Sequence, residues 1–137
     1  MKQKLFTIGF TVLAIITIII CVLFITHRQE VSGQGTITFE IIDVDGTLLD
    51  QKVVKFKDKD NLLSLVEANY EIELMYGMII KIDALYTPNL SKEFIKIYQN
   101  CDATTVGITS VTFKDGDVFR FVLTEFDPNG EFSDKYC

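Results

Sequence analysis

An uncharged apolar run near the N-terminus constrains this chain more than any other feature. Leu5 to Thr26 contains no Asp, Glu, Lys or Arg, and most of its polar side chains are threonines. As a helix, these roughly 22 residues rise about 33 Å. A hydrocarbon core about 30 Å thick needs about 20 consecutive apolar residues. The run therefore predicts a transmembrane helix over residues 5–26 that contacts the lipid bilayer along its length.

The residues on either side of this run indicate its orientation. Lys2 and Lys4 precede it, whereas His27, Arg28 and Glu30 follow it. Positive charge close to a membrane segment is retained on the cytoplasmic side. We therefore expect a single-pass protein of the cell membrane with its C-terminal domain extracellular.

Two kinds of processed leader fit the run less well. A cleaved signal peptide has a shorter apolar region that ends in small residues, whereas Thr26-His27-Arg28 follows here. A lipoprotein signal would use Cys21, but bulky Ile20 precedes it and the apolar run continues after it. The sequence favours a retained signal-anchor helix.

Composition changes after the anchor and marks one further domain. We expect a membrane anchor at residues 1–28, a polar and Gly-containing linker at 29–35, a folded domain at 36–126 and an irregular tail at 127–137. All 19 acidic residues lie beyond the apolar run, as do all 13 Lys and Arg residues except Lys2 and Lys4. The acidic balance argues against binding nucleic acid or an anionic membrane surface.

Alternating polar and apolar residues predict several strands and one helix in the domain. The expected strands are residues 36–42, 52–57, 78–82, 94–98, 111–113 and 118–123. The expected helix covers residues 61–69, with Asp60 as its N-cap. Asp45-Gly46 predicts a hairpin turn between the first two strands. A hairpin, one helix and then further strands predict an α+β domain whose helix packs on a mixed sheet, a β-grasp-like plan.

The cysteine, histidine and acidic patterns indicate no cofactor and no metal. Cys101 and Cys137 allow one disulfide in an oxidising compartment, and the sequence leaves open whether it forms. The only histidine is His27, beside the apolar run, so no Ser-His-Asp or Cys-His arrangement can form within the domain. The clusters that begin at Asp43 and Asp127 both lack the glycine that an EF-hand loop needs at its sixth position.

One short motif is similar to a catalytic one. Asp43-Val44-Asp45-Gly46-Thr47 resembles the first motif of haloacid dehalogenase-type phosphatases, which would make Asp43 the nucleophile, Asp45 the general acid and Mg²⁺ the cofactor. That family also needs further residues on a doubly wound parallel sheet, whose long crossovers this chain does not predict. A hairpin turn explains the same residues. We expect no enzyme activity, with the phosphatase as a remote alternative.

Short motifs follow one another along residues 36–126. They are Asp45-Gly46, the helix start Leu62-Leu63-Ser64-Leu65, Tyr76-Gly77 before a strand ending Lys81-Ile82-Asp83, the strand end Ile97-Tyr98-Gln99-Asn100-Cys101 with Val106-Gly107-Ile108 after it, and Lys114-Asp115-Gly116-Asp117. In order and spacing, this set resembles the transcobalamin-like C-terminal domain family of bacterial surface proteins. The resemblance implies an exported, anchored ligand-binding or interaction module without chemistry of its own, with cobalamin as one candidate ligand.

A binding site in such a domain is expected on loops that a rigid sheet holds in place. The best candidate is the loop from Asn100 to Gly107. The expected ligand-binding residues are Tyr98, Asn100, Asp102, Thr104, Thr105 and Gly107. Tyr98 would offer a flat face to a planar ligand, and Gly107 would supply a positive φ at a turn. Docking of a protein partner within a surface complex stays open as the alternative.

Overall fold

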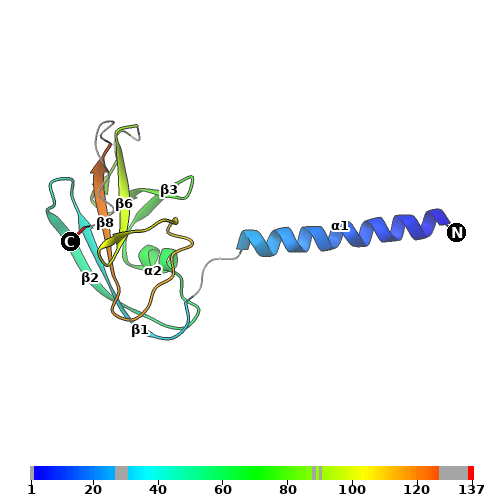
Figure 1. Cartoon of the computed structure of the whole chain (residues 1–137). Helices are drawn as coiled ribbons and strands as arrows, with labels where there is room; N and C mark the ends of the chain where they lie inside the picture. The colour runs from blue at the N-terminus through cyan, green and yellow to red at the C-terminus, as the bar shows by residue number, and fades with distance from the viewer. Residues whose placement is uncertain (1, 27–30, 88, 90, 127–135) are drawn as a thin grey trace.

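The computed structural model describes residues 2–26, 31–87, 89, 91–126 and 136–137 of the chain. Its first element is α1, Lys2–Thr26, which Figure 1 shows as one long helix. Within it, the hydroxyls of Thr7, Thr11 and Thr17 each donate to the backbone carbonyl four residues earlier. These polar groups are therefore satisfied inside the helix. By length and composition, Lys2–Val22 is apolar enough to cross a membrane, and none of it is buried against the rest of the described chain.

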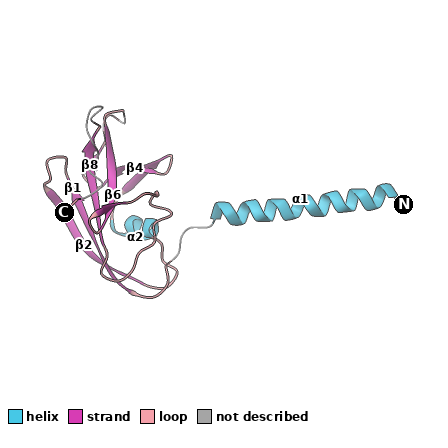
Figure 2. Ribbon diagram, in the orientation of Figure 1, coloured by secondary structure: helices cyan, strands magenta, loops and turns pink. Residues whose placement is uncertain are grey.

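A five-stranded mixed sheet forms the body of the domain (Figure 2). Its strand order is β2 (Leu48–Phe56), β1 (Gly35–Ile42), β8 (Val118–Glu125), β6 (Glu93–Gln99) and β7 (Asp102–Ala103). β1 pairs antiparallel with β2 and parallel with β8, and β8 pairs antiparallel with β6. The predicted α+β class, with its hairpin, helix and mixed sheet, is confirmed, and α2 (Leu62–Asn69) is the one domain helix among the described residues.

A second, three-stranded sheet follows the domain helix and is absent from the sequence prediction except for its middle strand. It consists of β3 (Ile72–Met75), β4 (Met78–Ile82) and β5 (Leu85–Tyr86). Tyr76 and Gly77 join β3 to β4, and both have positive φ, 51° and 78°. The chain break expected at Tyr76-Gly77 is thus a tight hairpin turn.

The hydrophobic core lies between the inner face of the main sheet and α2, Leu62–Asn69. Phe39 on β1 is fully buried, with its ring centroid 6.3 Å from that of Phe119 and 5.9 Å from that of Phe121, both on β8. The helix contributes Leu62, Leu63 and Val66 to the same core. Alternate residues of β1 and β8 therefore face α2, as their period of two predicts.

Several boundaries differ from the sequence prediction. The N-cap of α2 is Asn61, whose side chain accepts from the Ser64 backbone N–H at 3.0 Å, and not Asp60, which accepts from the Lys57 N–H. Residues 111–113 form no strand. The predicted tail lies outside the described residues except for Tyr136 and Cys137.

The packed part of the domain starts earlier than the expected residue 36. Val31 is only 5% exposed and belongs to the core. Its N–H donates to the Asp60 carbonyl, and its own carbonyl accepts from the Lys59 N–H, both at 2.9 Å. Only residues 27–30 therefore separate α1 from a docked part of the domain.

Candidate functional site

The phosphatase-like motif forms the turn of the β1–β2 hairpin. The Asp43 N–H donates to the Thr47 carbonyl and the Gly46 N–H to the Asp43 carbonyl, each at 2.9 Å. The Asp45 carboxylate accepts from the Thr47 N–H, and hydrogen bonding to Thr47 lowers the pKa of Asp45. Gly46 has φ 84°. Each motif residue thus has a role in turn geometry, and the strands on either side run antiparallel.

A polar hollow of ≈ 360 Å³ lies where the sequence predicts the binding loop. Side chains from two stretches of the segment between β6 and β8 line it. They are Gln99, Asn100, Asp102, Ala103, Thr104, Thr105 and Val106 from the first stretch, and Ser110, Val111 and Thr112 from the second. Hydroxyl and amide groups dominate this lining, so the hollow can form hydrogen bonds with a neutral polar ligand.

A buried carboxylate fixes the two stretches to each other. Asp117 is 4% exposed and accepts from the Gln99 side-chain amide at 2.8 Å, the Asn100 side-chain amide at 3.1 Å and the Lys114 N–H at 3.0 Å. The Gln99 amide also donates to the Thr112 carbonyl at 2.9 Å. Because a buried carboxylate is costly without donors, this set of bonds holds the walls of the hollow in one arrangement.

Asn100 begins the loop in a backbone conformation that few residues adopt readily. Its φ is 57°, in the left-handed region that asparagine tolerates better than most side chains. Its side-chain oxygen accepts from the Val118 N–H at 3.0 Å, and its N–H donates to the Val118 carbonyl. The side chain of Asn100 therefore continues the β6–β8 pairing beyond the last residue of β6.

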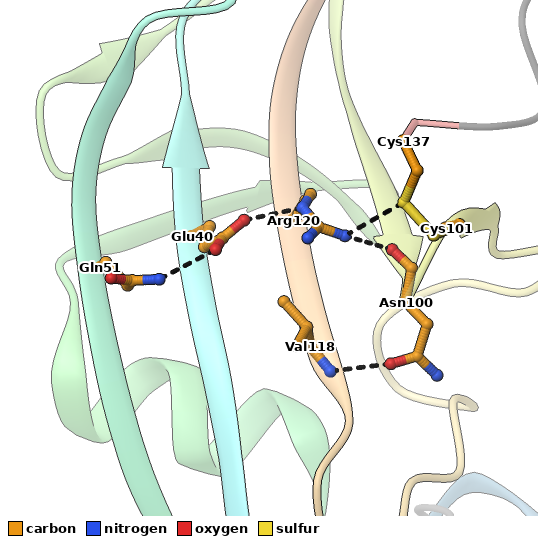
Figure 3. A network of polar contacts seen from close by, with 7 residues as sticks. All are labelled: Glu40, Gln51, Asn100, Cys101, Val118, Arg120 and Cys137. Carbon is orange, nitrogen blue, oxygen red and sulfur yellow. Dashed lines mark hydrogen bonds and ion pairs between the residues drawn. A yellow bond between two sulfur atoms is a disulfide. The ribbon is translucent and has the colours of Figure 1, made fainter.

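A polar chain across the outer face of the sheet reaches the same residue (Figure 3). Gln51 on β2 donates to Glu40 on β1 at 2.9 Å, and Glu40 pairs with Arg120 on β8 at 2.7 Å. The Arg120 guanidinium donates to the Asn100 carbonyl and lies 4.0 Å from the Cys137 sulfur. Side chains from three strands thus help to fix the position of Asn100, which lines the hollow.

A disulfide joins the loop to the end of the chain. Cys101 and Cys137 are bonded, with their Cα atoms 5.4 Å apart, which is the pairing that the sequence left open. The Tyr136 N–H donates to the Cys101 carbonyl at 2.8 Å. The Tyr136 ring packs against Tyr98, with 5.4 Å between centroids. The last two residues therefore cover part of the outer face of the sheet.

The structure brings four of the six proposed ligand-binding residues into the hollow: Asn100, Asp102, Thr104 and Thr105. Tyr98 is only 4% exposed and packs with Tyr136, Ile42 and Val122, so the prediction that its ring offers an open face to a ligand is wrong. Gly107 does not line the hollow and is not among the residues with positive φ. Its carbonyl instead accepts from the Ser110 N–H in a turn.

Sequence reasoning missed the second wall of the hollow. Ser110 and Thr112 alternate with buried Val111 and Phe113, a pattern that predicts a strand with one polar face. The sequence shows the polar face of Ser110 and Thr112, but it does not show that this face lies opposite the stretch from Gln99 to Val106. Among the described residues, no three His, Cys, Asp or Glu side chains come together in a group that could hold a metal ion.

No protein-family model matches the sequence, and neither does any curated protein. A solved structure from Ruminococcus gnavus, described as a "putative metal binding protein", has a similar fold, with a TM-score of 0.52 and 20% sequence identity. The match covers 68% of this chain and 99% of that one. At this identity the similarity shows the fold alone.

Proposed function

We propose that this chain is a membrane-anchored binding protein whose extracellular domain holds a small polar ligand in the hollow between residues 99 and 112. The hollow carries the proposal. Its volume of ≈ 360 Å³ falls in the range of small-molecule sites, and buried hydrogen bonds and a disulfide preform its walls. A preformed site loses less conformational freedom on binding.

The lining suggests the chemical class of the ligand. Asp102 is its one charged side chain, whereas Asn100, Thr104, Thr105 and Ser110 supply neutral donors and acceptors. This chemistry suits a compound rich in hydroxyl or amide groups, such as a neutral sugar or an N-acetylated amino sugar. The transcobalamin-like resemblance adds corrinoids, which exceed the hollow in size and would insert only an amide-bearing edge.

Calorimetric titration of the full chain in detergent tests this proposal. The panel is neutral and N-acetylated sugars, cyanocobalamin, and Zn²⁺ and Ca²⁺, the last two because of the description of the structural neighbour. Thr105→Trp fills the hollow from an exposed position and should weaken binding of the sugar or corrinoid at least about tenfold, roughly 1.4 kcal/mol. Thr109→Trp is the matched control, because Thr109 is exposed on the same segment but does not line the hollow.

Two outcomes would contradict the proposal. One is the absence of saturable binding by every sugar and corrinoid of the panel. The other is binding that is unchanged in Thr105→Trp. Mg²⁺-dependent hydrolysis of a phosphate ester that Asp43→Asn abolishes would contradict the non-catalytic part and support the phosphatase reading.

A second candidate function is docking of a protein partner, and the β3–β4 hairpin favours it. Tyr76 at its tip is 97% exposed and Met78 is 60% exposed. The Gly77 carbonyl oxygen lies 3.8 Å from the point that a Cβ on Gly107 would occupy. This apolar tip therefore adjoins the turn that separates the two walls of the hollow. Loss of a partner in Tyr76→Ser but not in Thr105→Trp would favour docking over ligand capture.

A further inference from the structure

Exposed lysines gather at one end of the domain, and carboxylates outnumber lysines at the other. One end, at the bottom in Figure 1, contains the start of β1, the end of β2 and the start of β8, since Gly35 pairs with Phe56 and Thr38 pairs with Val118. We call it the entry end, because the chain reaches it directly from the anchor. The opposite end carries the β1–β2 turn and the start of β6, where Glu93 pairs with Glu125.

Lysines with free ammonium groups lie at the entry end. Lys55, Lys57 and Lys59 are exposed on the end of β2 and the turn that follows, and Lys114 is exposed on the neighbouring turn before β8. The two turns are adjacent, since the Phe56 and Phe113 rings beside them pack with 5.0 Å between centroids, and the Gly116 N–H donates to the carbonyl of Thr36, the β1 partner of Lys55. Within the described part of the chain, none of the four ammonium groups forms an ion pair or hydrogen bond.

The aspartates of the entry end, unlike its lysines, form hydrogen bonds within the domain. Asp58 accepts from the Gly33 N–H, Asp60 from the Lys57 N–H, and Asp115 from the Thr36 N–H, at 2.7 to 3.1 Å. Asp117 is buried beneath Gln99 and Asn100. These carboxylates keep their negative charge, so the four aspartates offset the four lysines in net charge at this end. They are held against N–H groups of the fold, however, whereas the lysine ammonium groups extend toward solvent. The opposite end carries four carboxylates and, among the described residues, one lysine, Lys92; the carboxylates are those of Asp43, Asp45, Glu93 and Glu125.

The length of the connection brings the entry end close to any membrane that α1 crosses. Five Cα steps from Thr26 to Val31 span at most about 17 Å. The headgroup region outside the hydrocarbon core accounts for roughly 5 to 8 Å of this distance. The Lys59 N–H donates a hydrogen bond to the Val31 carbonyl. The turn that contains Lys57 and Lys59 therefore cannot lie much farther from the headgroups than one Debye length of about 8 to 10 Å.

We propose that the four lysines of the entry end, Lys55, Lys57, Lys59 and Lys114, seat the domain on anionic lipid headgroups, with the acidic β1–β2 turn pointing away from the bilayer. This inference rests on the proposed membrane anchoring. The net negative charge of the domain argues against free binding to such a surface, but the anchor removes the need for capture from solution. The entry end is close to neutral overall but exposes its lysines, whereas the opposite end is acidic, so repulsion of the opposite end from anionic lipid leaves the lysines facing the bilayer.

Resonance energy transfer from the opposite end of the domain to the bilayer tests whether the entry end rests on the lipid. The full chain, with Cys21→Ser and a donor dye on Val44→Cys in the β1–β2 turn, is incorporated into nanodiscs containing acceptor-labelled lipid. With phosphatidylglycerol present, transfer should be weak, because the turn is held away from the lipid. In phosphatidylcholine alone, or in about 1 M salt, transfer should rise roughly twofold as the domain reorients freely.

Lysine substitutions separate this proposal from others. Lys55→Gln, Lys57→Gln and Lys59→Gln combined should raise transfer in anionic nanodiscs to the level seen with phosphatidylcholine. The control triple variant, Lys81→Gln, Lys92→Gln and Lys96→Gln, should leave it low. An energy-transfer efficiency that does not change with lipid charge, or that rises equally in both triple variants, would contradict the proposed contact between the lysines and the lipid. Failure of the chain to enter nanodiscs would overturn the anchoring itself.

Discussion

At the scale of single residues, Tyr70 has the most unusual environment. Its hydroxyl is buried near Asp50, and no described residue gives it a hydrogen bond of good geometry, while its ring packs against Phe39 and lies 4.1 Å from the Lys52 ammonium. Burial first, and then the negative charges of Asp50 and Asp83, raise the pKa of Tyr70 above its ordinary value. Both effects disfavour the phenolate in the folded protein.

This environment predicts how stability depends on alkaline pH. Because the folded-state pKa is raised, the contribution of Tyr70 is fully present below the unfolded pKa of about 10 and is lost as pH rises above it. Tyr70→Phe should remove that loss. Near pH 7 the variant should equal or exceed the wild type by about 1 kcal/mol, since it deletes an unsatisfied buried hydroxyl. Urea unfolding at pH 7 and pH 11 measures both effects.

The matched control is Tyr86→Phe, because Tyr86 is 53% exposed and lies on β5 of the second sheet. Lysines titrate in the same pH range, so the comparison is between proteins at each pH. If Tyr70→Phe loses as much unfolding free energy between pH 7 and pH 11 as the wild type does, Tyr70 does not titrate as argued.

At the scale of elements, the disulfide between the loop after β6 and Cys137 should stabilise the domain. Cys101 and Cys137 are 36 residues apart, and closing such a loop contributes about 3 to 4 kcal/mol in the chain-entropy model. Cys101→Ser with Cys137→Ser should lower the unfolding free energy by about this amount. Cys21→Ser, in α1, is the control and should have no effect. Reductant should bring the wild type to the level of the double variant; unchanged midpoints in either test would contradict the argument.

Elements were predictable where a local pattern sufficed. β1, β4, β6 and β8 follow from alternation, because each has a face in the core and another outside it. β5 and β7 have two residues each, too few for a period of two to be visible. The segment 111–113 alternates in the same way, yet its Thr112 carbonyl accepts from the Gln99 side chain, and no strand forms.

At the scale of the whole molecule, what could not be predicted depends on contacts between distant segments. The loop after β6 was found because polar residues follow a strand, but the wall around Ser110 depends on Asp117 bonding to Gln99 and Asn100. The exposure of Tyr98 depends on Tyr136, 38 positions later in the sequence. Net charge is likewise an average, and it conceals the lysines of the entry end.

The membrane topology of the whole chain gives the last prediction, and both proposals depend on it. Lys2 and Lys4 lie on one side of the uncharged run, and the acidic domain lies on the other. Positive charge should hold the N-terminus in the cytoplasm and place the domain outside. In a Cys21→Ser background, a membrane-impermeant maleimide should therefore label Gln34→Cys on intact cells. It should label Gln3→Cys only after lysis.

The two positions control for each other, because both glutamines are exposed and each cysteine reports one side of the same helix. The disulfide removes Cys101 and Cys137 from the labelling reaction. The reverse pattern, with Gln3→Cys labelled on intact cells, would put the domain in the cytoplasm and contradict an extracellular ligand. If neither position is labelled before lysis, the domain is not exposed on the cell surface. If the labelled protein is shortened at its N-terminus, the apolar run is a cleaved leader and not an anchor. Only labelling of the full-length chain at Gln34→Cys alone keeps the hollow outside the cell while the entry end stays beside the bilayer.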